Sequence, residues 1–401
     1  MDLPEIEPLA CRRSTLEGPR INLLIPAVSE RHVFGGIATA LELFRQLSAA
    51  FPRARLVVLD ETRARWAPHS FFANWPVVAS GHGEAEAARC VVFCGARDRG
   101  ELPVAPHDAF LATSWWSAYV GQRVREWQRE QFGTVPAMGY FIQDFEPGFY
   151  PWSSRYALAE STYRRPDETI AVFNTRLLAD YMHERGLRFS RRHVLEPRMN
   201  PAILAVRETL APFRKQRRIL VYGRPSVERN GFALLVRALR LWRERYARHA
   251  EWELVSAGET HAGVDLGGGV ALRSVGKLTL TEYAAMIAGT AIGVSLMISP
   301  HPSYPPLEMA AFGCDVVTNG FANKDLSVLS PRIHSVSDLD AESVAAEIVR
   351  LCEAFDRRGE SPVVQLDEAI VAGGFTEKDG AFPFCGELAR QLGAGEARVR
   401  A

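Results

Sequence analysis

The segment at 299–318 combines residue types that suit a phosphorylated, hydroxyl-rich ligand. It follows an apolar run at 291–297 that predicts a buried parallel strand, and Pro305 and Pro306 then suit the first turn of a helix. Because such a helix start presents N–H groups and a positive dipole, it attracts a diphosphate. Glu308, one turn further on, is placed to accept hydrogen bonds from ribose hydroxyls. The alternative interpretation is a proline-rich turn before an ordinary helix.

A second segment places two arginines after a strand. The run 218–222 is strand-like, Gly223 follows it, and Arg224 and Arg229 precede a helix predicted at 232–246. Two guanidinium groups can bind one phosphate group with a planar geometry that lysine lacks. Since the 47 basic residues include only four lysines, an arginine pair is common in this chain. Its position after a strand therefore carries the prediction.

A glycine pair opens the first predicted helix. Gly35 and Gly36 follow a strand predicted at 21–25 and begin a helix predicted at 36–50. Without side chains, the backbone there can closely approach a phosphate or a sugar. A tight turn between a strand and a helix explains the same pair equally well.

Polar side chains also follow the strand predicted at 138–142. Gln143, Asp144 and Glu146 come first, and an aromatic loop continues to Pro151. Aromatic faces suit the C–H faces of sugars, and a carboxylate can take a proton from an attacking hydroxyl. Alternatively, the two carboxylates only cap the next helix.

Strand-like and helix-like segments alternate along the chain, which predicts parallel sheets covered by helices on both faces. In the first half the predicted strands are 21–25, 55–59, 90–94, 109–112, 138–142 and 169–173, and the predicted helices are 36–50, 117–129, 155–163 and 175–185. In the second half the predicted strands are 218–222, 253–256, 270–275, 291–297, 315–318 and 333–336, and the predicted helices are 232–246, 280–287, 306–312 and 341–355.

The length of 401 residues is too great for one compact core and fits two domains. We predict an α/β fold with one Rossmann-like domain at 1–204 and a second at 217–373. A polar stretch at 205–216 is the predicted linker, and residues 374–401 form a C-terminal tail of undefined role.

The second half resembles the nucleotide-binding half of family 4 glycosyltransferases, whose pattern is Gly-Arg-x4-Lys-Gly followed later by Glu-x7-Glu. Gly223 and Arg224 match the first part, with Arg229 in place of lysine, and Glu308 matches the second glutamate. Pro300 occupies the position of the first glutamate, which lies near the transferred sugar in family members. The resemblance implies the GT-B fold, two Rossmann-like domains facing each other across a cleft.

The loop after 138–142 and the segment Ser-Pro-His-Pro-Ser-Tyr-Pro-Pro-Leu-Glu resemble more closely the WsaF-like bacterial rhamnosyltransferases, which use dTDP-rhamnose. This implies transfer of rhamnose to a hydroxyl of a growing surface glycan, with a glycan or lipid-linked glycan as acceptor and no cofactor. The N-terminal domain then faces the acceptor and the C-terminal domain binds the donor.

The resemblance and the residue types together assign three roles. The catalytic residues are Asp144, which orients or deprotonates the acceptor, and Arg224 and Arg229, which stabilise the departing diphosphate. Gln143 and Glu146 are predicted to bind the acceptor. The residues predicted to bind the nucleotide-sugar are Gly35, Gly36, Gly223, Gly276, Lys277, Ser303, Tyr304, Pro305, Pro306 and Glu308. Lys277 is alternatively a solvated surface residue.

Composition and charge exclude several classes of function. The balance of 47 basic and 47 acidic residues favours neither nucleic-acid binding nor strong attraction to an anionic membrane. The six cysteines lack metal-ligand or disulfide spacing, and the chain shows no signal-peptide pattern and no long apolar run. We therefore expect a cytoplasmic protein with at most peripheral membrane contact. Asp338 and Asp340 form an Asp-x-Asp pair, but capping of the following helix explains them better than a metal site, so we expect metal-independent transfer.

Two other classes of function remain open. One is a nucleotide-sugar epimerase or hydrolase of GT-B fold, which turns over the donor without an acceptor. The other is an inactive nucleotide-binding scaffold in glycan assembly, which Pro300 in place of the glutamate favours. The scaffold hypothesis predicts tight nucleotide binding without turnover, and the presence of Glu308 and both arginines argues against it.

Overall fold

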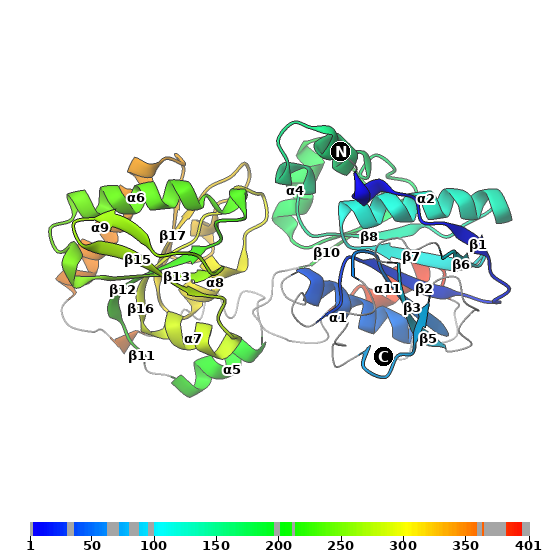
Figure 1. Ribbon diagram of the computed structural model, residues 1–401, viewed down its shortest axis with the longest axis horizontal. Coiled ribbons are helices and arrows are strands. Elements are labelled where there is room, and N and C mark those ends of the chain that lie inside the picture. Colours follow the sequence, from blue (N-terminus) through cyan, green and yellow to red (C-terminus); the bar gives the residue numbers. More distant parts are fainter. Residues whose placement is uncertain are drawn as a thin grey trace. The chain divides into compact units, whose positions relative to one another are not determined.

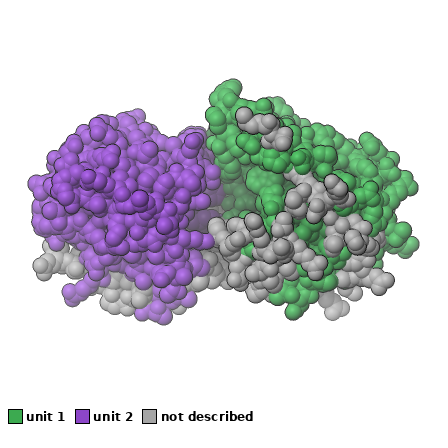
Figure 2. Space-filling model, in the orientation of Figure 1, with its two compact units in different colours: residues 1–195, 378–401 green, residues 196–377 purple. Residues whose placement is uncertain are grey.

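The computed structural model divides into two compact units, Met1–Leu195 with Lys378–Ala401 and Glu196–Glu377 (Figure 2). The residues that it describes are 3–29, 36–61, 72–79, 88–94, 100–195, 201–210, 213–358, 363–364 and 382–394. None of the described helices combines the length and the apolar composition that a membrane span requires.

The first unit is built on an eight-stranded sheet in the order β10-β9-β8-β7-β2-β3-β5-β4, in which all pairs are parallel. Its strands are β2 (Arg20–Ile25), β3 (Arg53–Val58), β4 (Val77–Ala79), β5 (Arg89–Phe93), β7 (Asp108–Ala112), β8 (Met138–Ile142), β9 (Thr169–Phe173) and β10 (Arg191–Val194). Its helices are α1 (Gly36–Ala49), α2 (Trp115–Phe132), α3 (Ser154–Ser161), α4 (Arg176–Glu184) and α11 (Cys385–Gln391). A separate parallel pair joins β1 (Cys11–Arg13) to β6 (Leu102–Val104).

The second unit is built on a seven-stranded sheet in the order β14-β15-β13-β12-β16-β17-β18, parallel except for β14. Its strands are β12 (Gln216–Gly223), β13 (Glu253–Gly258), β14 (Val264–Gly267), β15 (Val270–Gly276), β16 (Thr290–Val294), β17 (Asp315–Asn319) and β18 (Ile333–Val336). Its helices are α5 (Pro201–Leu210), α6 (Phe232–Arg245), α7 (Leu280–Gly289), α8 (Tyr304–Ala311) and α9 (Ala341–Arg357). A short antiparallel pair joins β11 (Phe213–Arg214) to β19 (Val363–Val364).

Helices cover both faces of each sheet (Figure 1). In the second unit α6 and α9 pack on each other and share one core with β12 and β16. On the other face α8 lies close to β16, where a Cβ on Gly293 would lie 2.4 Å from the sulfur of Met309. The absence of a side chain at Gly293 therefore lets α8 approach the strand that leads into it.

The alternating pattern is confirmed by the structure. Every strand and helix predicted from it is present, with ends shifted by a few residues, and the fold is α/β with two parallel sheets. Elements without a clear pattern, such as β1, β6 and β14, lie at sheet edges or form small separate pairs. The strand predicted at 291–297 ends at Val294, and the predicted linker at 205–216 includes the end of α5, β11 and the start of β12.

The C-terminal segment returns to the first unit. Within the predicted tail at 374–401, Leu388 in α11 and Leu392 directly after it are fully buried in the same core as α1. The ring of His193 stacks on Phe384 with centroids 4.8 Å apart, and its Nε2 lies 3.0 Å from Oε1 of Gln391. The described part of the tail is therefore a structural element of the N-terminal unit.

We expect the change Leu388→Ala to lower the free energy of unfolding by about 2–5 kcal/mol, because it removes a fully buried side chain and leaves a cavity. Urea unfolding of the full chain measures the effect. Arg390→Ala, at an exposed position on the same helix, is the matched control and should cost about 0.5 kcal/mol or less. Equal, small effects of both changes would show that α11 does not belong to this core.

Candidate active site

The order of strands in the second unit changes direction at β12. β13 and β15 lie on one side of β12 and β16 lies on the other, and in open parallel sheets ligands bind at such a switch point, outside the carboxyl ends of the two strands. Gly223 ends β12, Gly276 ends β15, and α8 begins beyond β16. The segments predicted to bind the nucleotide therefore end at this edge of the sheet.

Buried side chains fix the loop between β16 and α8. The side chain of Asn319 accepts a hydrogen bond from the N–H of Met297 at 2.7 Å and donates one to its carbonyl at 3.1 Å. The ammonium group of Lys324 donates to the same carbonyl at 2.5 Å. The N–H of Ile298 donates to the carbonyl of Arg229 at 2.7 Å. The loop before α8 is therefore held against the arginine segment that follows β12.

The backbone before α8 is strained. Ser303 has a φ of 68°, in the left-handed region, and its side chain makes no capping hydrogen bond. Its N–H donates to Nδ1 of His301 at 3.0 Å, and the ring of Tyr304 lies 5.9 Å from the His301 ring. Pro305 and Pro306 are buried in the first turn, as predicted. Backbone strain of this kind persists only where the surrounding structure holds it in place, and it is concentrated at active sites and ligand sites.

Glu308 lies next to a tyrosine from another helix. Its side chain keeps some exposed surface, but burial raises the pKa of the carboxyl to about 7. The hydroxyl of Tyr283 on α7 acts in the opposite direction and lowers the pKa of Glu308. A substantial fraction of Glu308 is therefore protonated at neutral pH.

Tyr222 lies near charged residues of both predicted donor-binding segments, the one after β12 and the one that opens α8. Burial raises the pKa of Tyr222, and the positive charge of Arg224 lowers it. The negative charge of Glu308 raises the same pKa, and the positive charge of Arg229 lowers it. Arg224, Arg229 and Glu308 therefore all lie within electrostatic reach of one side chain, although they come from two distant segments. The structure brings these three predicted residues together.

Two glycines of this site are required by packing. A Cβ on Gly223 would lie 2.1 Å from the hydroxyl of Ser256. Gly276 has a φ of 68°, and a Cβ there would lie 2.6 Å from the hydroxyl of Thr260. These contacts explain both glycines without a ligand, and they keep the ends of β12 and β15 open.

Lys277 is exposed, as the alternative interpretation of this residue expected. Partial desolvation lowers the pKa of Lys277, and the positive charge of Arg224 lowers it further. Lys277 therefore lies near the arginine segment, although its side chain faces solvent.

The first unit has a similar switch point in its own strand order. β3 and β5 lie on one side of β2 and β7 lies on the other, so the corresponding edge is at the carboxyl ends of β2 and β7. Glu61, which follows β3, accepts hydrogen bonds from the N–H groups of Val28 at 2.9 Å and Ser29 at 3.1 Å. The chain that enters the glycine turn is thereby fixed at this edge.

Gly36 and Gln143 are in direct contact at this edge of the sheet. A Cβ on Gly36 would lie 1.4 Å from Oε1 of Gln143, so a side chain at position 36 would displace the Gln143 amide. The Nε2 group of Gln143 donates to the carbonyl of Thr113 at 2.7 Å, at the end of β7. Gly35 lies outside the described residues. The structure therefore joins the glycine turn to the polar segment after β8.

Glu146 supports the start of a helix. Its carboxylate accepts hydrogen bonds from the N–H of Trp115, the first residue of α2, and from the hydroxyl of Tyr140 at 3.3 Å. The side chain is buried, with 5% of the residue exposed. Glu146 therefore has a capping role at the start of α2. The alternative interpretation of the sequence had placed this capping at the next helix along the chain. Binding of an acceptor by Glu146 stays a prediction.

Asp144 is also buried, with 7% of its surface exposed. One carboxylate oxygen accepts a hydrogen bond from the N–H of Phe145 at 2.8 Å, and the hydroxyl of Tyr163 donates to its backbone carbonyl at 3.4 Å. Asp144 follows β8 at the same edge as Gln143. Its predicted catalytic role needs a substrate hydroxyl to reach this edge of the first unit.

Sequence reasoning missed several residues of these sites. Tyr222 directly precedes Gly223 in the predicted motif, so its position next to the arginines was available from the sequence. Tyr283 and Asn319 have no local signal, because their partners lie far away in the chain. Thr113 and Glu61 contribute through contacts to backbone groups, which no residue pattern indicates.

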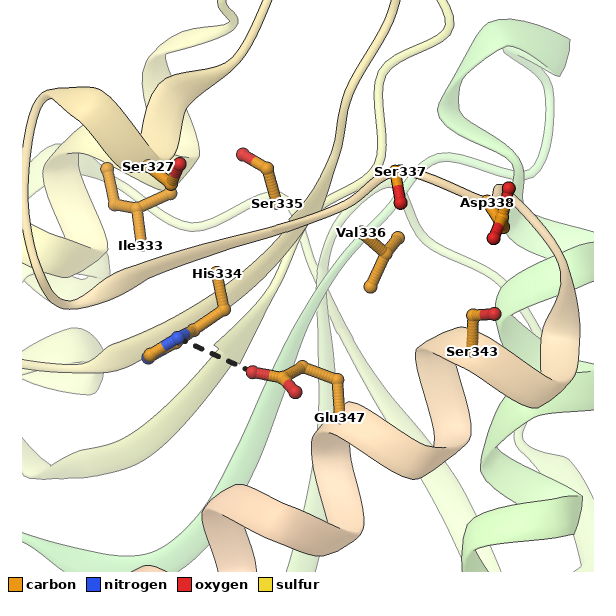
Figure 3. A pocket seen from close by; sticks show the side chains of 9 residues that line it. All are labelled: Ser327, Ile333, His334, Ser335, Val336, Ser337, Asp338, Ser343 and Glu347. Atoms are coloured by element: carbon orange, nitrogen blue, oxygen red, sulfur yellow. Dashed lines mark ion pairs between the residues drawn. The ribbon is translucent and has the colours of Figure 1, made fainter.

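A hollow of about 410 Å³ lies at the other end of the second sheet, beside the edge strand β18 (Figure 3). Nδ1 of His334 lies 3.4 Å from the carboxylate of Glu347, which also binds Arg350. β16 and β17 separate this strand from β12, so the hollow lies away from the switch point at β12.

Asp340 of the Asp-x-Asp pair caps the following helix, as predicted. Oδ1 of Asp340 accepts a hydrogen bond from the N–H of Ser343 at 2.6 Å, at the start of α9. Among the residues that the structure describes, no three histidine, cysteine or acidic side chains are arranged to hold a metal ion. Metal-independent transfer stays a prediction.

Comparisons with known proteins agree with this fold. Sucrose-phosphate synthase from Thermosynechococcus elongatus has a similar structure, with a TM-score of 0.56 and 13% identity over 94% of this chain and 99% of that chain. WaaG, a glycosyltransferase involved in lipopolysaccharide biosynthesis, gives a TM-score of 0.55 and 13% identity over 94% and 100%. The O-antigen biosynthesis protein RfbC of Myxococcus xanthus is 33% identical over 296 residues, which are 72% of this chain. The chain spans about a fifth, 21%, of the length of that relative.

The fold is that of the GT-B glycosyltransferases. The model of the WsaF N-terminal domain matches residues 20–176, and the model of the WsaF C-terminal domain matches residues 217–349. The chain therefore belongs to the WsaF family of glycosyltransferases.

We expect Glu308→Gln to stabilise the protein at alkaline pH in the absence of nucleotide. The pKa of Glu308 is about 7 in the folded chain against an ordinary value of 4.5, so ionisation opposes folding. This cost is absent below pH 4.5, grows as the pH rises and is complete above pH 7. The variant should therefore be more stable at pH 8, by up to about 3 kcal/mol, with no difference near pH 4.5.

Urea unfolding at both pH values measures this difference. Glu353→Gln, at an exposed position on α9, is the control and should change the free energy of unfolding little at either pH. If Glu308→Gln is no more stable than the wild type at pH 8, burial does not raise the pKa of Glu308.

Proposed function

We propose that this protein transfers rhamnose from dTDP-rhamnose to a hydroxyl of a growing bacterial surface glycan. The observation that carries the proposal is the convergence of Arg224, Arg229 and Glu308 around Tyr222 at the carboxyl edge of the second sheet. Membership of the WsaF family supports a nucleotide-sugar as donor and a glycan as acceptor.

In this proposal the second unit stabilises the leaving group. The bond between the sugar and the diphosphate breaks with a build-up of negative charge on the diphosphate. Arg224 and Arg229, together with the N-terminal end of α8, offer positive charge and N–H donors that compensate it. Glu308 accepts hydrogen bonds from the ribose hydroxyls and fixes the position of the nucleoside. This arrangement supplies the charge stabilisation that a metal ion supplies in other transferases.

The first unit then orients the acceptor. Asp144 and Gln143 lie after β8, and Gly36 contacts Gln143, so a small polar surface is available at one edge of the sheet. In an inverting reaction Asp144 takes the proton of the attacking hydroxyl, whereas in a retaining reaction it orients that hydroxyl. The acceptor is a glycan or lipid-linked glycan, which a cytoplasmic protein with at most peripheral membrane contact reaches from the membrane surface.

The printed names of the similar proteins support a surface glycan as the product. RfbC is an O-antigen biosynthesis protein, and WaaG is involved in lipopolysaccharide biosynthesis. Since this chain spans 21% of RfbC, the biological role of the whole relative enters here only as support for the proposal.

A second candidate function is an inactive nucleotide-binding scaffold. Pro300 stands where family 4 transferases carry a glutamate near the transferred sugar, and it is buried in the loop before α8. A scaffold binds the nucleotide through Arg224 and Glu308 but does not turn over the donor. Turnover of the donor in the presence of an acceptor separates the two functions.

The donor is tested by thermal-shift titrations with dTDP-rhamnose and with UDP- and GDP-sugars. We expect dTDP-rhamnose to raise the melting temperature by several degrees and expect Arg224→Ala and Glu308→Ala to abolish the shift. Arg237→Ala, an exposed arginine on α6, is the control and should leave the shift unchanged. Stabilisation by a different nucleotide would contradict rhamnose as the sugar, and no response to any would contradict the donor site itself.

The acceptor side is tested with Asp144→Asn. Because Asp144 belongs to the first unit, we expect unchanged stabilisation by the donor and a rate of sugar transfer about 10²-fold lower. Release of dTDP with a lipid-linked glycan from bacterial membranes as acceptor measures the rate. Asp167→Asn, at an exposed position before β9, is the control. An unchanged rate in Asp144→Asn would exclude a catalytic role for this carboxylate.

A further inference from the structure

One buried ammonium group links the helices that carry Tyr283 and Glu308. Lys215 donates to the carbonyl of Ile287 in α7 at 3.0 Å and to the carbonyl of Phe312, after α8, at 2.7 Å. Tyr283 lies four residues before Ile287, and Glu308 lies four residues before Phe312. Each side chain therefore stands one helical turn before the carbonyl that Lys215 binds.

The start of α7 is fixed as well. Thr279 and Glu282 form a capping box, in which each side chain bonds the backbone N–H of the other residue. The N–H of Tyr283 donates to the carbonyl of Thr279 at 2.9 Å. Tyr283 thus lies in a helix whose two ends are both anchored, so the direction of its side chain is well defined.

The hydroxyl of Tyr283 is buried and finds no fully formed hydrogen bond among the residues that the structure describes. It lies within the influence of the Glu308 carboxyl, since each group changes the pKa of the other. A buried hydroxyl without a partner costs free energy. The cost disappears when an ionised carboxylate turns to accept a hydrogen bond from that hydroxyl. The other ionisable groups that face this pair are Tyr222 on β12 and Cys314 before β17.

We propose that Tyr283 is a positioning residue for Glu308. Its phenol donates a hydrogen bond to one oxygen of the ionised carboxylate and leaves the remaining lone pairs for the ribose hydroxyls of the donor. The inference rests on the proposed function, in which Glu308 binds the ribose. It adds that the affinity for the nucleotide depends on pH and that Tyr283 sets this dependence.

The sign of the dependence follows from the burial of Glu308. The pKa of this carboxyl is about 7, and the ribose hydroxyls donate best to its ionised form. The apparent dissociation constant is the intrinsic one divided by the ionised fraction, so it should rise about tenfold between pH 8 and pH 6. Removal of the Tyr283 hydroxyl raises the pKa of Glu308, and a higher pH is then needed for the same affinity.

The test is Tyr283→Phe, which keeps the ring and removes only the hydroxyl. Isothermal titration with dTDP, UDP and GDP at pH 6, 7 and 8.5 measures the dissociation constants. We expect the variant to bind the preferred nucleotide about fivefold more weakly at pH 7 and within about twofold of the wild type at pH 8.5. A merely structural role would weaken binding equally at each pH.

Two controls complete the experiment. Tyr246→Phe removes a hydroxyl that bonds Asp356 elsewhere in the second unit, and it should leave the pH profile unchanged. In the background of Glu308→Gln, the change Tyr283→Phe should have no pH-dependent effect, because the titrating group is absent. The inference is overturned if Tyr283→Phe binds the nucleotide like the wild type at pH 7. It is also overturned if the affinity of the variant at pH 8.5 does not return to within about twofold of the wild type. If the wild type binds none of the three nucleotides, the proposed function itself is wrong.

Discussion

The C-terminal ends of α7 and α8 share a single buried ammonium group, and the candidate donor site depends on that interaction. Lys215 binds one carbonyl in α7 and one directly after α8, which holds the two helices that carry Tyr283 and Glu308 together. At the opposite edge of the sheet Lys324 binds the carbonyl of Met297 in the loop that leads into α8. Two of the four lysines in this arginine-rich chain are thus buried against backbone carbonyls, where a compact ammonium group fits better than a planar guanidinium.

The donor site retains features that weaken the folded state. Burial raises the pKa of Glu308, the Tyr283 hydroxyl lacks a full hydrogen bond in the described structure, and Ser303 has a left-handed backbone. Each feature opposes folding, and all three come from residues of α7, α8 and the turn before α8. Local conflicts of this kind are expected where a protein binds a ligand, because the ligand completes the interactions that folding leaves unsatisfied.

Most of the fold was predictable because strands and helices alternate and each has its own hydrophobic period. The places of Gly223, Arg224 and Glu308 in the fold were predictable as well, since each ends or follows a strand or lies near the start of a helix, whereas their roles stay predictions. The return of α11 to the first unit was not, because its burial depends on contacts with residues far away in the chain. The same reason applies to the capping of α2 by Glu146 and to the position of Tyr283, which no local pattern indicates.

A crystal structure of the protein with bound dTDP would show the donor site. We expect the ribose hydroxyls within hydrogen-bond distance of Glu308 and the diphosphate between Arg224, Arg229 and the N-terminal end of α8. We also expect a hydrogen bond from the Tyr283 hydroxyl to the carboxylate. A nucleotide bound elsewhere in the second unit, for example in the hollow beside β18, would show that these residues do not form the donor site.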